Sequence, residues 1–251
     1  MKNELVLARC NLFGVFGAIP KLLELDTEAA SIVRKKTISL GFVIKNGPSA
    51  TLSFANGRAE LCEGIEHCSI KLYFSSCKKF NDMIDGKGNP LPISGFWNIG
   101  FLLDKFVKLT DILSAYLRPT PEKLEDSEFF RRSTILMLHV IAGAVAEVGN
   151  YDKVGSFSAS NMVDGTVRVA IGEDLGVGID VKDHRLTALH DDPREGFSEM
   201  RFADLRVARD LFDGRINAVA AVGEGKVRIG GMISQVDNLN RILDRVSIYL
   251  A

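Results

Sequence analysis

The chain contains one pattern twice: residues 74–89, FSSCKKFNDMIDGKGN, align without a gap with residues 202–217, FADLRVARDLFDGRIN. Five aligned pairs are identical, namely Phe74/Phe202, Asp82/Asp210, Asp85/Asp213, Gly86/Gly214 and Asn89/Asn217. Each stretch predicts the end of a strand followed by a short helix, with Ser76 or Asp204 as the N-cap and the Asp-Gly pair as the stop. The pattern indicates an internal repeat.

The match continues downstream in the same order. Further pairs are Gly95/Gly225, Ile99/Ile229, Gly100/Gly230, Ser114/Ser247, Tyr116/Tyr249 and Leu117/Leu250. In the second copy we expect two short strands, at 216–222 and 226–229, around the glycines at 223 and 225. A long amphipathic helix then closes each copy, because apolar residues recur there every three or four positions.

Upstream of the shared pattern, apolar and polar residues alternate. This period of two predicts strands with one buried face. The alternating residues are Ile38, Leu40 and Phe42, then Ala50, Leu52 and Phe54, in the first copy, and Val167, Val169 and Ile171, then Val177, Ile179 and Val181, in the second. Polar turns lead from each second strand to a third, so each sheet opens as an antiparallel meander.

Each copy also begins with a helix, over residues 5–23 and 135–148. Pro119 and Pro121 separate the copies, because proline ends one helix and suits the start of the next. We therefore predict domains at 1–118 and 119–251. The predicted fold class is α+β: two tandem domains, each a roughly five-stranded, largely antiparallel sheet with helices packed on one face.

This order of elements resembles the sterol carrier protein type-two family. The resemblance rests on Asp213-Gly-Arg215 and on Gly225-Lys-Val-Arg-Ile-Gly-Gly231, and it covers nearly all of residues 151–251. The first copy keeps Asp85-Gly-Lys87 but has Gly95-Phe-Trp-Asn-Ile-Gly100 in place of the lysine-containing strand, so it is the divergent copy. The resemblance implies an apolar tunnel between the sheet and the last helix, which holds a fatty acid, acyl-CoA, sterol or phospholipid without catalysis.

If each copy has such a tunnel, apolar residues on the sheet and on the last helix are its candidate lining. In the second copy they are Val177, Ile179, Phe202, Ile229, Ile233, Val236, Leu239 and Leu243. In the first copy they are Phe42, Phe54, Trp97 and Phe106. The same residues also suit a solid core, so a second hypothesis stands beside lipid binding: an interaction or accessory scaffold whose cavity is filled.

The composition limits the class of partner. Lys plus Arg number 31 and Asp plus Glu 32, for a net charge of −1, which does not favour a nucleic-acid binder. Residues 133–146 are apolar but too short to span a bilayer, so we expect no stable membrane insertion. The ligand expected is a fatty-acyl or similar lipid, and a homodimer is left open.

The remaining motifs do not indicate catalysis or a cofactor. Cys10, Cys62, Cys68 and Cys77 form no C-x-x-C pair, so we expect free thiols, no metal site and a cytoplasmic location. His139 falls in an apolar helix, and His184 and His190 fall near aspartates without a positioned nucleophile. We therefore predict that the protein is not an enzyme and needs no cofactor.

Overall fold

The structure is a computed structural model that describes residues 2–88 and 90–250. The chain divides into two compact units, Met1–Leu136 and Met137–Ala251. This division falls inside a helix and later than the two prolines at which the sequence predicts the boundary. The start of that helix belongs with the first unit, because the Ser133 hydroxyl donates to the Tyr116 carbonyl at 2.6 Å and the Phe129 ring stacks on Tyr116.

The first unit contains five helices and five strands. Its helices are α1 (Glu4–Arg9), α2 (Ile19–Leu25), α3 (Thr27–Val33), α4 (Cys77–Ile84) and α5 (Val107–Leu117). A π-helical stretch, Cys10–Val15, and a 3-10 turn, Phe16–Ala18, join α1 to α2, and a second π-helical stretch, Phe101–Phe106, leads into α5. Its strands are β1 (Ile38–Ile44), β2 (Ser49–Ala55), β3 (Arg58–Glu63), β4 (Ile70–Phe74) and β5 (Leu91–Ser94).

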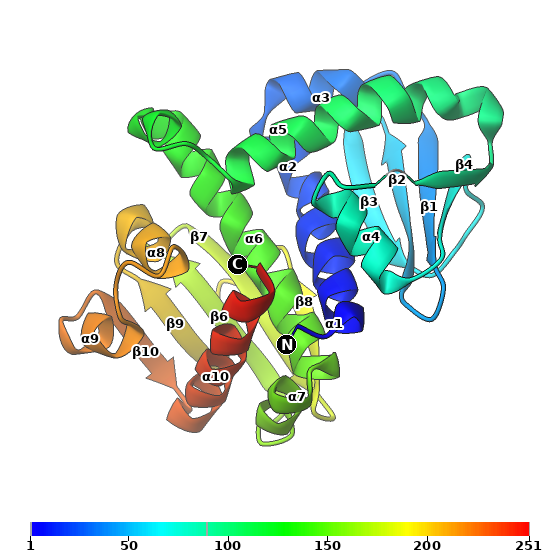
Figure 1. Cartoon of the computed structure of the whole chain (residues 1–251). Coiled ribbons are helices and arrows are strands. Elements are labelled where there is room, and N and C mark those ends of the chain that lie inside the picture. The colour runs from blue at the N-terminus through cyan, green and yellow to red at the C-terminus, as the bar shows by residue number, and fades with distance from the viewer. Residues whose placement is uncertain (1, 89, 251) are drawn as a thin grey trace. The chain divides into compact units, whose positions relative to one another are not determined.

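The second unit repeats this order. Its helices are α6 (Ser127–Tyr151), which starts within the first unit, then α7 (Lys153–Ala159), α8 (Leu205–Phe212), α9 (Ala218–Gly223) and α10 (Ile233–Leu250). Its strands are β6 (Gly165–Ile171), β7 (Leu175–Lys182), β8 (Arg185–Leu189), β9 (Ser198–Phe202) and β10 (Val227–Gly231). In Figure 1, α6 and α10 lie over one face of its sheet.

The two sheets have the same topology. Their strand orders are β3-β2-β1-β4-β5 and, read from the other edge, β8-β7-β6-β9-β10. In each sheet one pair of strands is parallel, β1 with β4 or β6 with β9, and the other pairs are antiparallel. The predicted fold class is confirmed: the protein is α+β, with two five-stranded mixed sheets and helices packed against them.

The residues that alternate in the sequence form the buried faces of these sheets. Leu40, Leu52 and Phe42 are buried in the first unit, and Val167, Val177 and Ile179 in the second. The predicted helix caps are confirmed, because Ser76 Oγ accepts from the Lys79 N–H and Asp204 Oδ1 accepts from the Val207 N–H. Gly86 and Gly214 then end these helices with positive φ, as the Asp-Gly pairs predict.

Two details of the predicted repeat are wrong. The expected strand at 216–222 is helix α9, because Asn217 caps it by accepting from the N–H groups of Val219 and Ala220. Gly95 corresponds to Gly231 and not to Gly225, since both lie at the end of the fifth strand with positive φ: Gly95 directly follows β5, and Gly231 is the last residue of β10. A Cβ at either glycine would overlap a carbonyl oxygen of the neighbouring strand, so the tight turn requires glycine.

A buried aspartate joins the last helix of each unit to a short helix that precedes the sheet. Asp26 accepts from the Ala29 N–H at 2.8 Å and from the Tyr116 hydroxyl at 2.7 Å. Asp152 does the same in the second unit, accepting from Val154 and Gly155 N–H groups at 3.0 Å and from Tyr249 at 2.7 Å. Arg245 adds two charge-assisted bonds to Asp152, at 3.0 and 2.9 Å.

Two helical segments are long and apolar enough to cross a membrane, Glu4–Leu25 and Ser127–Tyr151. The second segment is longer than the uncharged stretch 133–146 noted in the sequence, because α6 continues through charged residues on both sides of it. Most of each apolar window is buried inside the structure, as in the core helices of globular proteins.

The hydrogen bonds that Asp152 accepts predict that the stability of the protein depends on pH. Burial raises the pKa of Asp152, but hydrogen bonds from Arg245, Tyr249 and the Gly155 N–H outweigh it and hold the pKa well below its ordinary value. This stabilisation is therefore complete above the pKa of an unfolded aspartate, about 3.9, and is lost as the pH falls towards the folded pKa. Urea unfolding measured from about pH 7 to pH 3 should show that the free energy of unfolding decreases more steeply for wild type than for Asp152→Asn.

At neutral pH, Tyr249→Phe should lower the free energy of unfolding by about 1 kcal/mol, because one buried hydrogen bond is lost. Tyr151→Phe is the matched control, since Tyr151 lies at the surface. If the free energy of unfolding depended on pH equally in wild type and in Asp152→Asn, the stabilising role assigned to the Asp152 carboxylate would be contradicted.

Candidate functional site

Most of the candidate pocket residues of the second unit lie in its buried interior. Val177, Ile179 and Phe202 are on the buried face of the sheet, and Val236 and Leu239 are on the buried face of α10. Phe202 lies beside Val227 of β10 in the sheet and packs edge-on against Phe212 of α8, with ring centroids 5.6 Å apart. The structure therefore brings these five residues into one apolar layer between sheet and helices.

Three other candidates of this unit lie elsewhere. Ile229 is 40% exposed and Ile233 is 74% exposed, while Leu243 is half-buried. The buried face of α10 consists of Gln235, Val236, Leu239, Ile242, Val246 and Tyr249. The predicted apolar stripe is thus rotated, because the first turn of α10 is oriented by the polar side chain of Gln235 and not by Ile233.

Ser198 and Gln235 hold the first turn of α10 against the start of β9. The Ser198 hydroxyl accepts from the Met232 N–H at 3.1 Å and donates to Gln235 Oε1 at 2.9 Å. Gln235 Nε2 donates to the Val163 carbonyl at 2.9 Å. Both side chains are buried and fully hydrogen-bonded, so this turn has a defined position.

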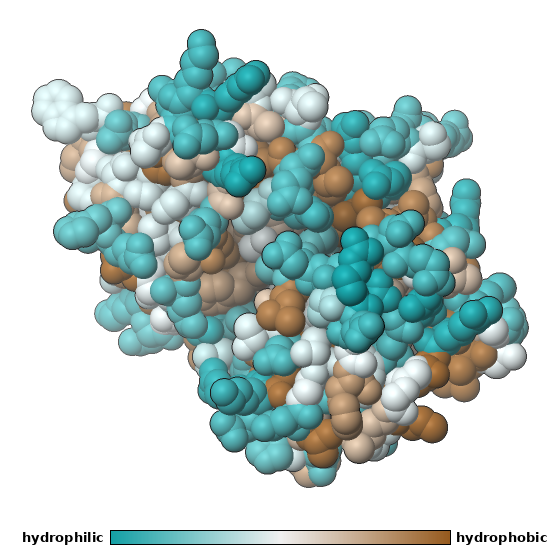
Figure 2. Space-filling model, turned by 180° about the vertical axis from the view of Figure 1, so that it is seen from behind, coloured by the Kyte–Doolittle hydropathy of each residue, from teal (hydrophilic) through white to brown (hydrophobic). Residues whose placement is uncertain are grey.

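Exposed apolar residues lie close in the chain to the residues of this polar contact. We call Phe197, Ile229, Met232 and Ile233 the apolar rim; all four are exposed. Their chain segments meet where Gly231 pairs with Ser198 across β10 and β9. On the face of the molecule drawn in Figure 2, apolar side chains likewise reach the surface among polar ones.

The candidate residues of the first unit behave differently. Phe42 and Phe106 are buried with ring centroids 6.3 Å apart, and both also pack on Phe16, at 5.3 and 5.8 Å. Phe54 packs on Phe101 at 5.6 Å. Aromatic rings from the sheet, from α5 and its approach, and from the N-terminal helical segment therefore contact one another. Trp97 neither fills nor lines this interior, because its side chain is 100% exposed.

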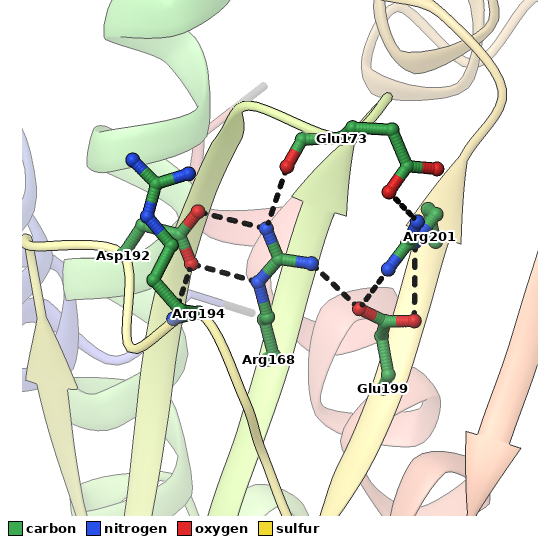
Figure 3. A network of polar contacts seen from close by, with 6 residues as sticks. All are labelled: Arg168, Glu173, Asp192, Arg194, Glu199 and Arg201. Carbon is green, nitrogen blue, oxygen red and sulfur yellow. Dashed lines mark hydrogen bonds and ion pairs between the residues drawn. The ribbon is translucent and has the colours of Figure 1, made fainter.

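A network of charged side chains occupies the other side of the second sheet (Figure 3). Arg168 of β6 is buried and donates from Nε and Nη2 to both carboxylate oxygens of Asp192, each at 2.7 Å. Its Nη1 donates to Glu199 at 2.7 Å, and Arg201 donates to Glu199 at 2.9 and 3.1 Å. Arg201 also pairs with Glu173. The network fastens the loop after β8 to the sheet.

These contacts set the protonation of the acidic groups. Hydrogen bonds from Arg168 hold the pKa of Asp192 below its ordinary value. Burial raises the pKa of Glu199, but the bonds from Arg201 and Arg168 outweigh it, and the net pKa is lowered. Both carboxylates are thus charged at neutral pH and matched by guanidinium groups, an arrangement that stabilises a loop rather than transfers protons.

The basic residues that could meet a lipid headgroup are also matched by acids. Arg215 contacts Asp210 and Asp213 at 3.3 and 3.1 Å, and Lys226 contacts Glu224 at 2.6 Å. Arg228, also exposed, lies on the opposite side of β10 from Ile229. The geometry near the apolar rim therefore favours recognition of an apolar chain over recognition of an anionic head.

The histidines and cysteines do not form a metal site. His139 Nδ1 lies 3.2 Å from His190 Nδ1, with the two rings stacked, and His184 Nδ1 lies 3.2 Å from the Met162 carbonyl. All four cysteines are free, as expected, although Cys62 alone is in a strand. Within residues 2–88 and 90–250, no group of three or more His, Cys, Asp or Glu residues is placed to hold a metal ion.

The sequence did not identify Phe197, Met232 or the Ser198–Gln235 contact. Phe197 and Met232 lie just outside strand and helix, where periodicity gives no signal. Gln235 lies outside the predicted buried stripe of α10 because that stripe contains apolar residues only. Residues 235, 239, 242, 246 and 249 nevertheless follow helical spacing.

No protein-family model matches the chain, and no curated protein does. Among solved structures, the chain is similar to one described as "Crystal structure of sterol carrier protein 2", with 16% sequence identity and a TM-score of 0.34. The match covers 44% of this chain and 92% of that chain. A TM-score of 0.34 is too low to indicate a function, so any function must be inferred from the residues of the site.

Substituting phenylalanine at two positions of α10 should separate buried from surface residues. Val236→Phe should lower the free energy of unfolding of the ligand-free protein by about 1–3 kcal/mol, because Val236 is 1% exposed and the larger ring must displace its buried neighbours. Ile233→Phe should change it by about 0.5 kcal/mol or less, since Ile233 faces solvent. Urea unfolding measures both; a stable Val236→Phe variant would show that space remains behind α10.

Breaking the charged network should destabilise the second unit. Asp192→Ala leaves the buried guanidinium of Arg168 without its bidentate partner, and we expect a loss of about 2–4 kcal/mol. Asp191→Ala is the matched control, because this neighbouring carboxylate is exposed. Urea unfolding compares the free energies of unfolding of the two variants. Equal, small losses in both would mean that the charged network contributes little to stability.

Proposed function

We propose that the protein binds the apolar chain of a lipid, fatty acyl or similar, in its second unit and carries it without chemical change. The observation that carries this proposal is the exposure of Ile229. Val227 and Ile229 lie two residues apart on β10 and point to the same side of the sheet. Val227 is 4% exposed, whereas Ile229 is 40% exposed. The helix-covered side of the sheet is therefore reached by solvent at Ile229, near the end of β10, and we place the ligand's entry there.

In this proposal, the ligand extends from the exposed side chain of Ile229 towards the apolar interior. Met200, the neighbour of Ile229 across the strands, is buried, as is Phe202. On the helix side, Ile233 marks the outside and Val236 the inside of the same turn of α10. An acyl chain lying along this path would contact apolar side chains over its length.

Burial of such a chain is energetically sufficient for binding. Each methylene contributes about 0.8 kcal/mol when it leaves water, so about ten methylenes give roughly 8 kcal/mol before costs. Loss of translational and rotational freedom takes back several kcal/mol. Affinity is then about millimolar for ten buried methylenes and about micromolar for a sixteen-carbon chain, whose burial gives roughly 12 kcal/mol before the same costs.

The filled-scaffold alternative describes the first unit better. The buried phenylalanines of its sheet contact those of the π-helical stretch that leads into α5, so aromatic rings occupy the layer between them. In this proposal, the first unit is a filled domain, and one ligand binds per chain. The four free thiols support a reducing, cytoplasmic location as part of the same proposal.

Native mass spectrometry of the purified chain, followed by organic extraction, tests the proposal. We expect one acyl lipid per chain, or uptake of one fluorescent fatty acid by the ligand-free protein. Ile229→Asp and Ile233→Asp place a charge at the opening and should weaken uptake about tenfold or more, which corresponds to at least about 1.4 kcal/mol. Circular dichroism verifies that both variants are folded.

Ile248→Asp is the matched control, because Ile248 is an exposed isoleucine on the same helix, far from the apolar rim. It should bind like wild type. A ligand-free mass together with no uptake of fatty acid would refute lipid binding and extend the filled-scaffold description to both units.

A further inference from the structure

One surface of the first unit is both uncharged and strongly apolar. Residues 90–103, PLPISGFWNIGFLL, contain no Asp, Glu, Lys or Arg, although a quarter of the whole chain is charged. Five large apolar side chains of this segment are exposed: Leu91, Ile93, Phe96, Trp97 and Leu103. We call these five residues the apolar protrusion. It belongs to a different unit from the apolar rim and is not used by the proposed ligand site.

The protrusion rests on an ordered base. Gly95 turns the chain sharply after β5, and the Asn98 N–H closes a 3-10 turn by donating to the Gly95 carbonyl at 2.9 Å. Phe101, Leu102 and Phe106, which follow, are buried and anchor the segment in the core. Trp97 and Phe96, which are 100% and 60% exposed, are thus displayed by a fixed turn.

The charged residues around the protrusion pair with one another. Lys105 and Lys108 contact Asp104 at 3.4 and 2.6 Å, and Lys87 and Arg118 contact Asp85 at 3.6 and 3.5 Å. These four cations exceed the two aspartates by two charges, but none of them belongs to residues 90–103, which carry no charge. The apolar side chains themselves therefore suit a partner that they meet through apolar contact and not through charge.

Backbone chemistry argues against another strand as that partner. Strand β5 is at the edge of its sheet, where an incoming strand would add. Pro90 and Pro92 lack the N–H groups that such a strand would use. A fully exposed tryptophan also projects into its surroundings rather than lining a groove. Its amphipathic ring suits the boundary between lipid headgroups and acyl chains.

We propose that the apolar protrusion docks the protein on a zwitterionic lipid surface, with Trp97 and Phe96 inserted at the level of the headgroups. The docking is peripheral and reversible, because a few side chains insert and no helix crosses the bilayer. It goes beyond ligand binding in the second unit, and the two activities are separable by substitution.

Trp97 is the only tryptophan of the chain and therefore reports its own environment. We would add phosphatidylcholine vesicles to the full-length protein and record the tryptophan emission. The emission should shift to shorter wavelength, and lipids with brominated acyl chains should quench it. Because apolar contacts and not charges hold the protein, about 0.5 M salt should leave binding unchanged.

Sedimentation with the same vesicles tests the residues. The double variant Phe96→Ser, Trp97→Ser should bind about tenfold or more weakly, whereas Val219→Ser, an equally exposed apolar residue of the second unit, should bind like wild type. The double variant should still take up fluorescent fatty acid in solution, which separates failure of docking from failure of the ligand site.

Three results would overturn the proposal. One is an unchanged Trp97 emission with no sedimentation of the protein. Another is binding that requires anionic lipid and disappears at high salt, since charge would then be the cause. The third is a dimer in analytical ultracentrifugation without vesicles that the double variant converts to monomer, which would identify a second copy of the chain as the occupant of the protrusion.

Discussion

In each unit a single buried carboxylate determines where the last helix lies. Asp26 and Asp152 each cap a short helix with one oxygen and accept a tyrosine hydroxyl from the last helix of the same unit with the other. A buried carboxylate is costly unless it is fully hydrogen-bonded, so the tyrosine and the capped helix are held together. This constraint holds the C-terminal ends of α5 and α10, and in the second unit Ser198 and Gln235 hold the start of α10.

The same framework leads to two different interiors. In the first unit, phenylalanines from sheet and helix fill the space that the framework defines. In the second unit the corresponding layer is built from smaller aliphatic side chains, such as Val177, Ile179 and Val236, and its edge is open at Ile229. The difference lies in side-chain volume and not in topology, since the two sheets have the same strand order.

The strands, the caps and the fold class could be predicted from sequence because they depend on local patterns: period-two alternation, and an aspartate or serine before a short helix. Helix α9 could not, since its valines favour strand while one side chain, Asn217, supplies the cap that decides for helix. The partnership of Arg168 with Asp192 depends on a loop that returns across the sheet, and no spacing reveals it. Trp97 was expected inside because large aromatic residues usually are, yet a turn at Gly95 exposes it.

Gly95 and Gly231 explain why exposed apolar residues occur at the same place in both units. Each glycine reverses the chain at the end of an edge strand, in space that no side chain can occupy. The residues that follow, Phe96 and Trp97 or Met232 and Ile233, then precede a helix whose position is already fixed by the buried carboxylate, and no further strand of that sheet lies beyond them. Their side chains are therefore left exposed at the edge of their own sheet. Our two proposals share this origin: they place the chain of a lipid beside Ile233 and a lipid surface beside Trp97.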